Sequence, residues 1–219
     1  MKRDFLWVEK YRPHKIDECI LPDGSKKSFQ GFLTQGEIPN LLLSGPAGVG
    51  KTTVARALCD EIGASYLLIN GSDEGRSIDT IRNKVKQFAT SVSLTSSAAH
   101  KVVILDEADN MTYDVQMILR AAIEEYHINC RFIFTCNFIN KIIEPLHSRC
   151  TVVDFRVKNG QKLELQKQFF DRLRWILKTE DVKFEDKVVA KLISRYYPDY
   201  RRLINECQRY AANGSIDSA

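Results

Sequence analysis

One octapeptide constrains the fold of this 219-residue chain more than any other feature. Residues 45–52 read GPAGVGKT and match the pattern G-x-x-x-x-G-K-[ST] at every fixed position. Glycines let the backbone N–H groups of such a loop curl around phosphate oxygens, and a helix N-terminus adds its positive end. The flanking segments fit, because an apolar run at 41–43 precedes the loop and an amphipathic stretch at 51–62 follows it. The sequence therefore predicts a phosphate-binding α/β domain.

The side chains of this loop predict ATP with Mg²⁺ as the ligand. Lys51 has the length to reach the β- and γ-phosphates, and the hydroxyl of Thr52 is a suitable Mg²⁺ ligand. We expect the nucleotide contacts of the loop to come from Gly45, Gly48, Val49, Gly50, Lys51, Thr52 and Thr53.

A second segment, residues 102–109, reads VVILDEAD and supplies two adjacent carboxylates at the end of an apolar run. A buried strand would deliver Asp106 at its carboxyl end, where ligands bind in open α/β sheets, as a Mg²⁺ ligand. Glu107 would then polarise the attacking water as a general base. A solvated acidic turn is the alternative interpretation, but the phosphate loop beside it favours an NTPase. The DEAD tetrapeptide also occurs in RNA helicases, whose second large domain does not fit into the roughly 60 residues that remain.

The alternation of apolar and amphipathic segments predicts a parallel five-stranded sheet with helices on both faces. The expected strands are 40–44, 66–70, 101–106, 131–136 and 151–155, and the expected helices between them are 51–62, 77–90 and 113–125. The pattern changes near residue 158, after which helices are expected at 161–179, 185–196 and 199–213. We therefore expect an α/β nucleotide-binding domain over 1–157 and a small all-helical domain over 158–219.

Composition adds limits rather than a function. The net charge of +4 permits anionic partners without demanding them. Because no apolar run approaches the roughly 20 residues of a membrane span, and the N-terminus lacks a secretory stretch, a cytoplasmic protein is expected. The six cysteines are scattered without a C-x-x-C pair, which favours reduced thiols over a zinc site.

Residues 7–13, WVEKYRP, resemble the N-terminal box of replication factor C small subunits and their phage counterparts, which are AAA+ clamp-loader proteins. In that family this segment lies against the adenine. The resemblance implies nucleotide contacts from Val8, Glu9, Lys10, Tyr11, Arg12 and Ile20.

Three further segments resemble motifs of the same family in the same order. Asn137 stands at the sensor-1 position, where it would bind the γ-phosphate or the attacking water. Residues 148–150 match the Ser-Arg-Cys motif, which implies that Arg149 completes the ATP site of a neighbouring subunit. Residues 198–205, PDYRRLIN, resemble the sensor-2 box of a helical lid and make Arg201 a phosphate contact, although the family often has glycine where Pro198 stands.

The resemblance extends from residue 7 to residue 217 and is closest to the clamp-loader large subunit of T-even-like bacteriophages. It implies an ATPase that opens a ring-shaped sliding clamp and places it on primer–template DNA, together with other clamp-loader subunits, in the host cytoplasm if the gene is phage-encoded. The family continues into a third, collar domain, and this sequence stops before it, so the chain is expected to be either truncated or naturally short.

The helix expected at 77–90 carries a basic face. Arg82 and Lys86 lie one turn apart, and Arg76 stands at the start of the helix. By resemblance these three residues would track a DNA backbone without reading bases, and a solvated basic face is the alternative. Two rival functions stay open for the chain: another AAA+ replication motor such as a helicase loader, or a nucleotide-binding assembly module that does not hydrolyse ATP.

Overall fold

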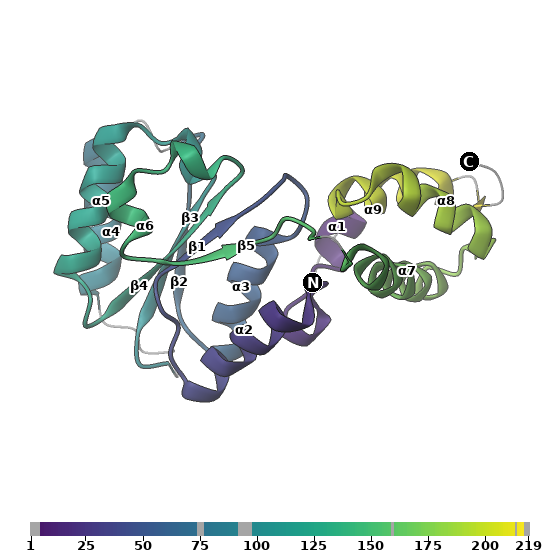
Figure 1. Ribbon diagram of the computed structural model, residues 1–219, viewed down its shortest axis with the longest axis horizontal. Coiled ribbons are helices and arrows are strands. Elements are labelled where there is room, and N and C mark those ends of the chain that lie inside the picture. The colour runs from purple at the N-terminus through teal and green to yellow at the C-terminus, as the bar shows by residue number, and fades with distance from the viewer. Residues whose placement is uncertain (1–4, 74–76, 92–97, 159, 213, 217–219) are drawn as a thin grey trace.

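The computed structural model describes residues 5–73, 77–91, 98–158, 160–212 and 214–216. These residues form two lobes, one built on a sheet and one helical, which we call the lid (Figure 1). The sheet has the strand order β2-β3-β4-β1-β5, and every neighbouring pair is parallel. Its strands are β1 (Leu41–Ser44), β2 (Tyr66–Asn70), β3 (Lys101–Asp106), β4 (Cys130–Cys136) and β5 (Thr151–Asp154). The predicted parallel five-stranded sheet is confirmed, with strand ends within a residue of expectation.

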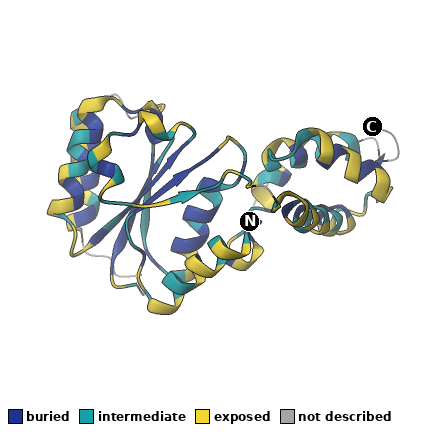
Figure 2. Ribbon diagram, viewed as in Figure 1, coloured by how far each residue is buried: buried dark blue, intermediate teal, exposed yellow. Residues whose placement is uncertain are grey.

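Helices cover both faces of this sheet, and the side chains between the layers are buried (Figures 1 and 2). The three central strands β1, β3 and β4 are apolar on both faces, as parallel strands between two helical layers must be. One face is covered by α2 (Asp23–Gln35) and α3 (Lys51–Ile62), and the other by α4 (Ile78–Thr90), α5 (Tyr113–Glu125) and α6 (Glu144–His147). Helix α2, which the sequence pattern did not reveal, contributes the fully buried Phe29.

Short 3₁₀ turns lie between these elements. They are η1 (Ile16–Glu18), η2 (Ala108–Asn110) and η3 (Ile139–Lys141). The second and third follow the carboxyl ends of β3 and β4 and contact each other. The residues that follow β3 and β4 therefore lie together at the carboxyl end of the sheet.

The lid consists of α7 (Lys162–Thr179), α8 (Asp186–Tyr196) and α9 (Tyr200–Ala211) around its own apolar core. Two two-residue strands, β6 (Lys183–Phe184) and β7 (Ser215–Ile216), pair at its far end, a detail that the sequence pattern did not show. The N-terminal helix α1 (Trp7–Lys10) also packs here, since Trp7 and Tyr11 belong to the lid core. We propose the boundary between the lobes after residue 157, with α1 reaching across it.

The backbone N–H of Trp7 donates to Oε1 of Gln208 at 3.0 Å, which fixes α1 against α9. Figure 1 shows α1 at the junction of the two lobes. Among the described residues, no helix has the length and apolarity that crossing a membrane requires.

Candidate functional site

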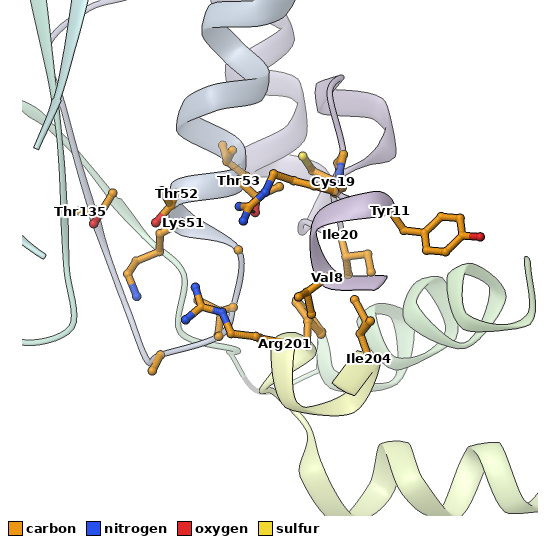
Figure 3. Close-up of a pocket in the computed structure, with 18 of the residues that line it drawn as sticks. Val8, Tyr11, Cys19, Ile20, Lys51, Thr52, Thr53, Thr135, Arg201 and Ile204 are labelled. Carbon is orange, nitrogen blue, oxygen red and sulfur yellow. Dashed lines mark hydrogen bonds between the residues drawn. The ribbon is translucent and has the colours of Figure 1, made fainter. Parts of the chain in front are cut away.

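A pocket of about 160 Å³ lies where the sheet lobe meets the lid. The phosphate loop and the ends of β3 and β4 border one end of it, and the N-terminal segment and α9 border the other (Figure 3). We call these the phosphate end and the base end. The phosphate end lies at the carboxyl ends of parallel strands, where open α/β sheets bind their ligands.

The phosphate loop has the backbone that its glycines allow. Gly50 has φ 92° and precedes α3, so a left-handed residue turns the chain into the helix N-terminus. Gly48 has φ 76°, and a Cβ there would lie 2.0 Å from Oδ1 of Asp199 in the lid. The N–H of Tyr200 donates to the carbonyl oxygen of Gly48 at 3.0 Å, so the lid rests directly on the loop.

Lys51 is buried, and its ammonium group lies within the curve of the loop. Its Nζ donates to the carbonyl oxygens of Gly45 and Pro46, each at 2.7 Å, and to Oδ1 of Asn137 at 2.9 Å. Burial lowers the pKa of Lys51, and the nearby carboxylates of Asp106 and Asp109 partly oppose this effect. Gly45 is not among the described residues that line the pocket, so its expected contact with the nucleotide stays a prediction.

Asp106 lies at the end of β3 and is held by two hydroxyl groups. Thr52 Oγ1 and Thr135 Oγ1 each donate to its Oδ1 at 2.6 Å. Thr135 is almost fully buried and also accepts a bond from the N–H of Glu107 at 3.1 Å. The sequence analysis did not find Thr135. Its only signal was its position two residues before Asn137, because alternate residues of a strand share one face of the sheet.

Glu107 follows directly and has a left-handed backbone, with φ 54°. A non-glycine residue in this region is uncommon and is found at functional sites. Its Oε2 accepts hydrogen bonds from the hydroxyl group of Ser72 and from Nδ2 of Asn110, the latter at 3.1 Å. Its carboxylate is therefore oriented by donors from the turns after β2 and β3, and Ser72 is a second residue that sequence analysis missed.

The base end is apolar and assembled from three distant segments. Val8, Ile20 and Ile204 lie close together in Figure 3, with Val8 on α1 and Ile204 on α9. Arg12 links this end to α3, because its Nη1 donates to Oγ1 of Thr53 at 3.1 Å. Its Nη2 also pairs with Oε1 of Glu9 at 2.5 Å, and this bond lowers the pKa of Glu9.

Two residues expected at the nucleotide point elsewhere. Lys10 is absent from the described lining of the pocket, and its Nζ pairs with Oε1 of Glu180 on the lid at 2.5 Å. Tyr11 borders the pocket, but its ring points away from it (Figure 3), and its hydroxyl group donates to the same Glu180 oxygen at 2.5 Å. The expected contact of Lys10 with the nucleotide therefore stays a prediction: Val8 and Glu9 are the residues of α1 that line the pocket, and the ammonium group of Lys10 is directed to Glu180.

The lid also places Arg201 at the pocket. It lies on the first turn of α9, and its guanidinium group points toward Lys51 and the phosphate loop (Figure 3). Burial is the main cause of the lowered pKa of Lys51, and the positive charge of Arg201 adds to it. A site with two adjacent cations is electrostatically suited to a polyphosphate.

Arg149 lies outside this pocket, between α6 and β5, with a side chain 27% exposed. Its Nη2 and Nε donate to Oε1 of Glu124 at 2.5 and 3.0 Å, and its Nη1 donates to the carbonyl oxygen of Pro145 at 2.8 Å. Arg120 lies 3.6 Å from the same Glu124 oxygen. The guanidinium of Arg149 is therefore held at the surface, away from the chain's own pocket.

The basic face expected on α4 is described in part. Arg82 and Lys86 are exposed on this helix, while Ile81, Val85 and Ala89 face the core. Arg76 lies outside the described residues. The helix begins after Ser77, whose Oγ accepts from the N–H of Thr80 at 3.4 Å as an N-terminal cap.

The donor set fits ATP and Mg²⁺. The loop backbone, Lys51 and Arg201 supply positive charge for phosphates. Thr52 and Asp106 present a hydroxyl and a carboxylate oxygen side by side, which are ligands that Mg²⁺ prefers. The apolar base end suits a purine ring.

Comparison with known proteins gives a consistent result along the chain. Residues 41–157 match the model of the ATPase family associated with various cellular activities (AAA), and residues 161–219 match the sliding-clamp-loader large subunit, AAA+ ATPase lid domain. The sliding-clamp-loader large subunit of Escherichia phage RB69 is 40% identical over 99% of this chain and 68% of its own length. The replication factor C small subunit of Archaeoglobus fulgidus is 40% identical over 98% of this chain and 66% of its own length.

Solved structures add a likeness in fold. A mutant of Thermotoga maritima RuvB superposes with a TM-score of 0.71 at 20% identity, covering 92% of this chain and 66% of its own. At that identity the likeness concerns the fold alone, and it extends across both the sheet lobe and the lid.

Proposed function

The chain belongs to the family of AAA+ sliding-clamp-loader subunits, and on this premise we propose that it binds ATP with Mg²⁺ in the pocket described above. It is an ATPase that acts in the ATP-dependent loading of a sliding clamp during DNA replication. Members of this family act in multisubunit complexes, and we propose that this chain assembles with copies of itself and with other loader subunits.

One observation supports the assignment of the residues most directly. Lys51 Nζ lies 2.9 Å from Asn137 Oδ1, and Thr52 Oγ1 lies 2.6 Å from Asp106 Oδ1, so segments from β1, β3 and β4 converge at one edge. Bound Mg²⁺ would neutralise charge that develops on the transferring phosphoryl group. Thr52 and Asp106 would hold the ion, and Lys51, Asn137 and Arg201 would orient the phosphates.

Glu107 would accept the proton of the attacking water. Its carboxylate follows the buried strand β3, and Ser72 and Asn110 fix its orientation. A general base has to lie within hydrogen-bond reach of the water that it activates, so this orientation matters for the rate. The presence of this residue beside a complete phosphate loop favours hydrolysis over an assembly module that only binds nucleotide.

Arg149 would act on a neighbouring subunit. The chain's own pocket already contains Lys51 and Arg201, whereas Arg149 is held at the surface by Glu124. An arginine supplied in trans stabilises charge on the γ-phosphoryl group and contributes about 10³–10⁵ in rate. The hypothesis requires two subunits for each working site.

Mixing variants in the assembled loader tests this arrangement. Arg149→Ala should bind ATP normally and lose turnover, and mixing it with Lys51→Ala chains should restore part of the activity. Some interfaces then pair an intact loop with an intact Arg149. Arg156→Ala is the control, since Arg156 is a more exposed arginine that is likewise paired with a carboxylate, that of Asp154 at 2.9 Å. Loss of ATP binding by the isolated Arg149→Ala chain would refute action in trans.

We propose that the exposed face of α4 contacts the backbone of primer–template DNA through Arg82 and Lys86, and that Arg76, outside the described residues, adds a third contact. Each alanine substitution should weaken DNA binding equally on all sequences and lower the salt slope by about one counterion. Lys191→Ala, an exposed change on α8, is the control. Unchanged affinity of the triple variant at low salt would leave these residues as a solvated surface.

The rival function of a helicase loader is not favoured by the comparisons, because the lid of this chain matches the clamp-loader family specifically over residues 161–219. The compartment is a further proposal: we place the protein in the cytoplasm, where a replication assembly of a phage or an archaeon meets its DNA.

A further inference from the structure

Asp109 is a buried carboxylate outside the nucleotide pocket, and the proposed reaction does not use it. It lies on η2, three residues after Asp106, and is 7% exposed. Its Oδ2 accepts hydrogen bonds from two consecutive backbone N–H groups, that of Asn137 at 3.2 Å and that of Phe138 at 3.1 Å. One side chain from the turn after β3 therefore holds the first two residues after β4.

The backbone at these two residues needs such a partner. The ladder between β1 and β4 ends with the pair Ser44 and Cys136, so the N–H groups of Asn137 and Phe138 lie beyond the sheet. The side chain of Phe138 is 59% exposed and contributes little packing. Among the described contacts, Asp109 is the side chain that binds both of these backbone N–H groups, and it thereby helps to fix the direction in which the chain leaves β4.

That direction decides where the side chain of Asn137 points. Its Oδ1 accepts a hydrogen bond from Lys51 Nζ at 2.9 Å, so a continuous path runs from Asp109 through the backbone of Asn137 to the phosphate loop. A shift of the Asn137 backbone would move its amide group away from Lys51 and from the γ-phosphate end of the pocket.

The carboxylate is not arranged for stability alone. Its second oxygen, Oδ1, is buried and has no hydrogen-bond partner within the described part of the chain. An unpaired buried oxygen of a charged group disfavours the folded state. A charged acceptor nevertheless forms shorter and stronger bonds to N–H groups than a neutral one, which suits a group that must hold a backbone firmly.

We propose that Asp109 is a positioning residue for ATP hydrolysis, which holds Asn137 in register with Lys51 through the two backbone N–H groups. This inference rests on the proposed roles of Asn137 and Lys51. It adds a residue that touches neither nucleotide nor metal and acts only through the end of β4.

Two substitutions separate the effect of the hydrogen bonds from the effect of the negative charge. Asp109→Ala removes both hydrogen bonds. Asp109→Asn keeps an oxygen acceptor of the same size and removes the charge, so weaker bonds to the same N–H groups are expected. Asp114→Ala and Asp114→Asn are the matched controls, because Asp114 is an exposed aspartate on the neighbouring helix α5.

The first measurement is amide hydrogen exchange in the nucleotide-free chain. In Asp109→Ala the amides of Asn137 and Phe138 should lose protection, and in Asp109→Asn they should exchange about fivefold to tenfold faster than in the unmodified chain, which is the weakening expected when charge assistance is lost. Protection in β3 and α3 should not change. If Asp109→Ala does not fold, the faster exchange in Asp109→Asn decides the question alone, and unchanged exchange at both amides overturns the proposal.

The second measurement separates nucleotide affinity from turnover. The affinity for ATP, followed with a fluorescent analogue, should change less than threefold, because Gly45 and Pro46 still hold Lys51. Turnover with partner subunits, clamp and DNA should fall about tenfold in Asp109→Ala and less in Asp109→Asn, since small misplacements of catalytic groups cost this much or more. Turnover within twofold of the unmodified chain for a folded Asp109→Ala overturns the positioning role. If the unmodified chain shows no turnover, the proposed function fails instead, and amide exchange still tests Asp109.

Discussion

The phosphate end and the base end of the nucleotide pocket are built from different kinds of structure. At the phosphate end, Lys51 and Thr135 are buried, and each is held by two or three hydrogen bonds from adjacent strands or turns. The base end is formed by apolar side chains from three segments. Val8 lies on α1, Ile20 lies in the loop before α2, and Ile204 lies on α9.

The phosphate end recognises phosphates through polar groups held by the sheet, whereas the base end depends on the position of the lid. Parallel strands position Lys51, Asp106 and Thr135 at the phosphate end, and the lid adds Arg201 to it. The base end exists only while α1 and α9 lie against each other and against the sheet lobe. The lid therefore contacts the nucleotide pocket in two places, at the base end and through the bond from Tyr200 N–H to the carbonyl oxygen of Gly48.

The largest expected effect lies at the phosphate end and concerns turnover alone. Glu107→Gln keeps the size and the hydrogen bonding of the side chain but removes the base, so turnover should fall about 10²–10⁴-fold. The affinity for ATP should stay within about twofold of that of the unmodified chain, because a general base acts in the chemical step and not in binding. Glu125→Gln, an exposed change on α5, is the control. A variant that hydrolyses ATP at the normal rate, or that no longer binds it, would remove Glu107 from the role of base.

The second effect tests binding at the same end. Lys51→Met keeps the length of the side chain and removes its charge, so ATP affinity should fall about 10²–10³-fold, the size expected for losing a buried charged partner. Equilibrium titration with a fluorescent analogue measures this loss. A fall of less than tenfold would mean that the glycine backbone and Arg201 suffice, and the phosphate end would then depend on the lid more than its geometry indicates.

The titration of Lys51 sharpens this test. Burial holds its pKa below the ordinary value of 10.5, so between the two values the unfolded chain binds more protons than the folded one. In that interval Lys51 makes the free energy of unfolding rise with pH, while ATP affinity falls as the ammonium group is lost. Lys51→Met should abolish both slopes, and denaturant unfolding at several pH values measures the first.

A smaller effect is expected at the base end. Ile204→Ala removes three carbons from the apolar surface, and at about 0.8 kcal/mol for each fully buried CH₂ a partial contact is worth roughly fivefold to tenfold in ATP affinity. The loss should be the same for ADP, because the base end does not touch the γ-phosphate. A variant that discriminated between ATP and ADP would show that the two ends are coupled more tightly than the comparison implies.

The smallest effect tests whether Lys10 contacts the nucleotide. Because its ammonium group pairs with Glu180 and not with the pocket, Lys10→Ala should change ATP affinity less than about twofold, as exposed ion pairs contribute little. Val8→Ala in the same helix is the comparison and should weaken binding more. An affinity loss for Lys10→Ala as large as that for Ile204→Ala would return Lys10 to the nucleotide site.

The sequence by itself determined the sheet and the phosphate end. The alternation of apolar and amphipathic segments predicted the parallel sheet. The octapeptide at 45–52 and the apolar run before Asp106 are local patterns of residue type and spacing, and they predicted the roles of Lys51 and Asp106. The fold prediction was confirmed for this reason. The role of each residue stays a prediction.

Only the tertiary structure decided what lies between segments far apart in the chain. The sequence pattern could not reveal that one oxygen of Asp106 accepts hydrogen bonds from both Thr52 and Thr135, or that Asp109 holds the backbone after β4. It could not orient Lys10 either, because a four-residue helix has no periodicity from which to read its buried face. A side chain's partner across a fold depends on how helices and strands pack, and packing energies sum over many distant contacts that no local pattern contains.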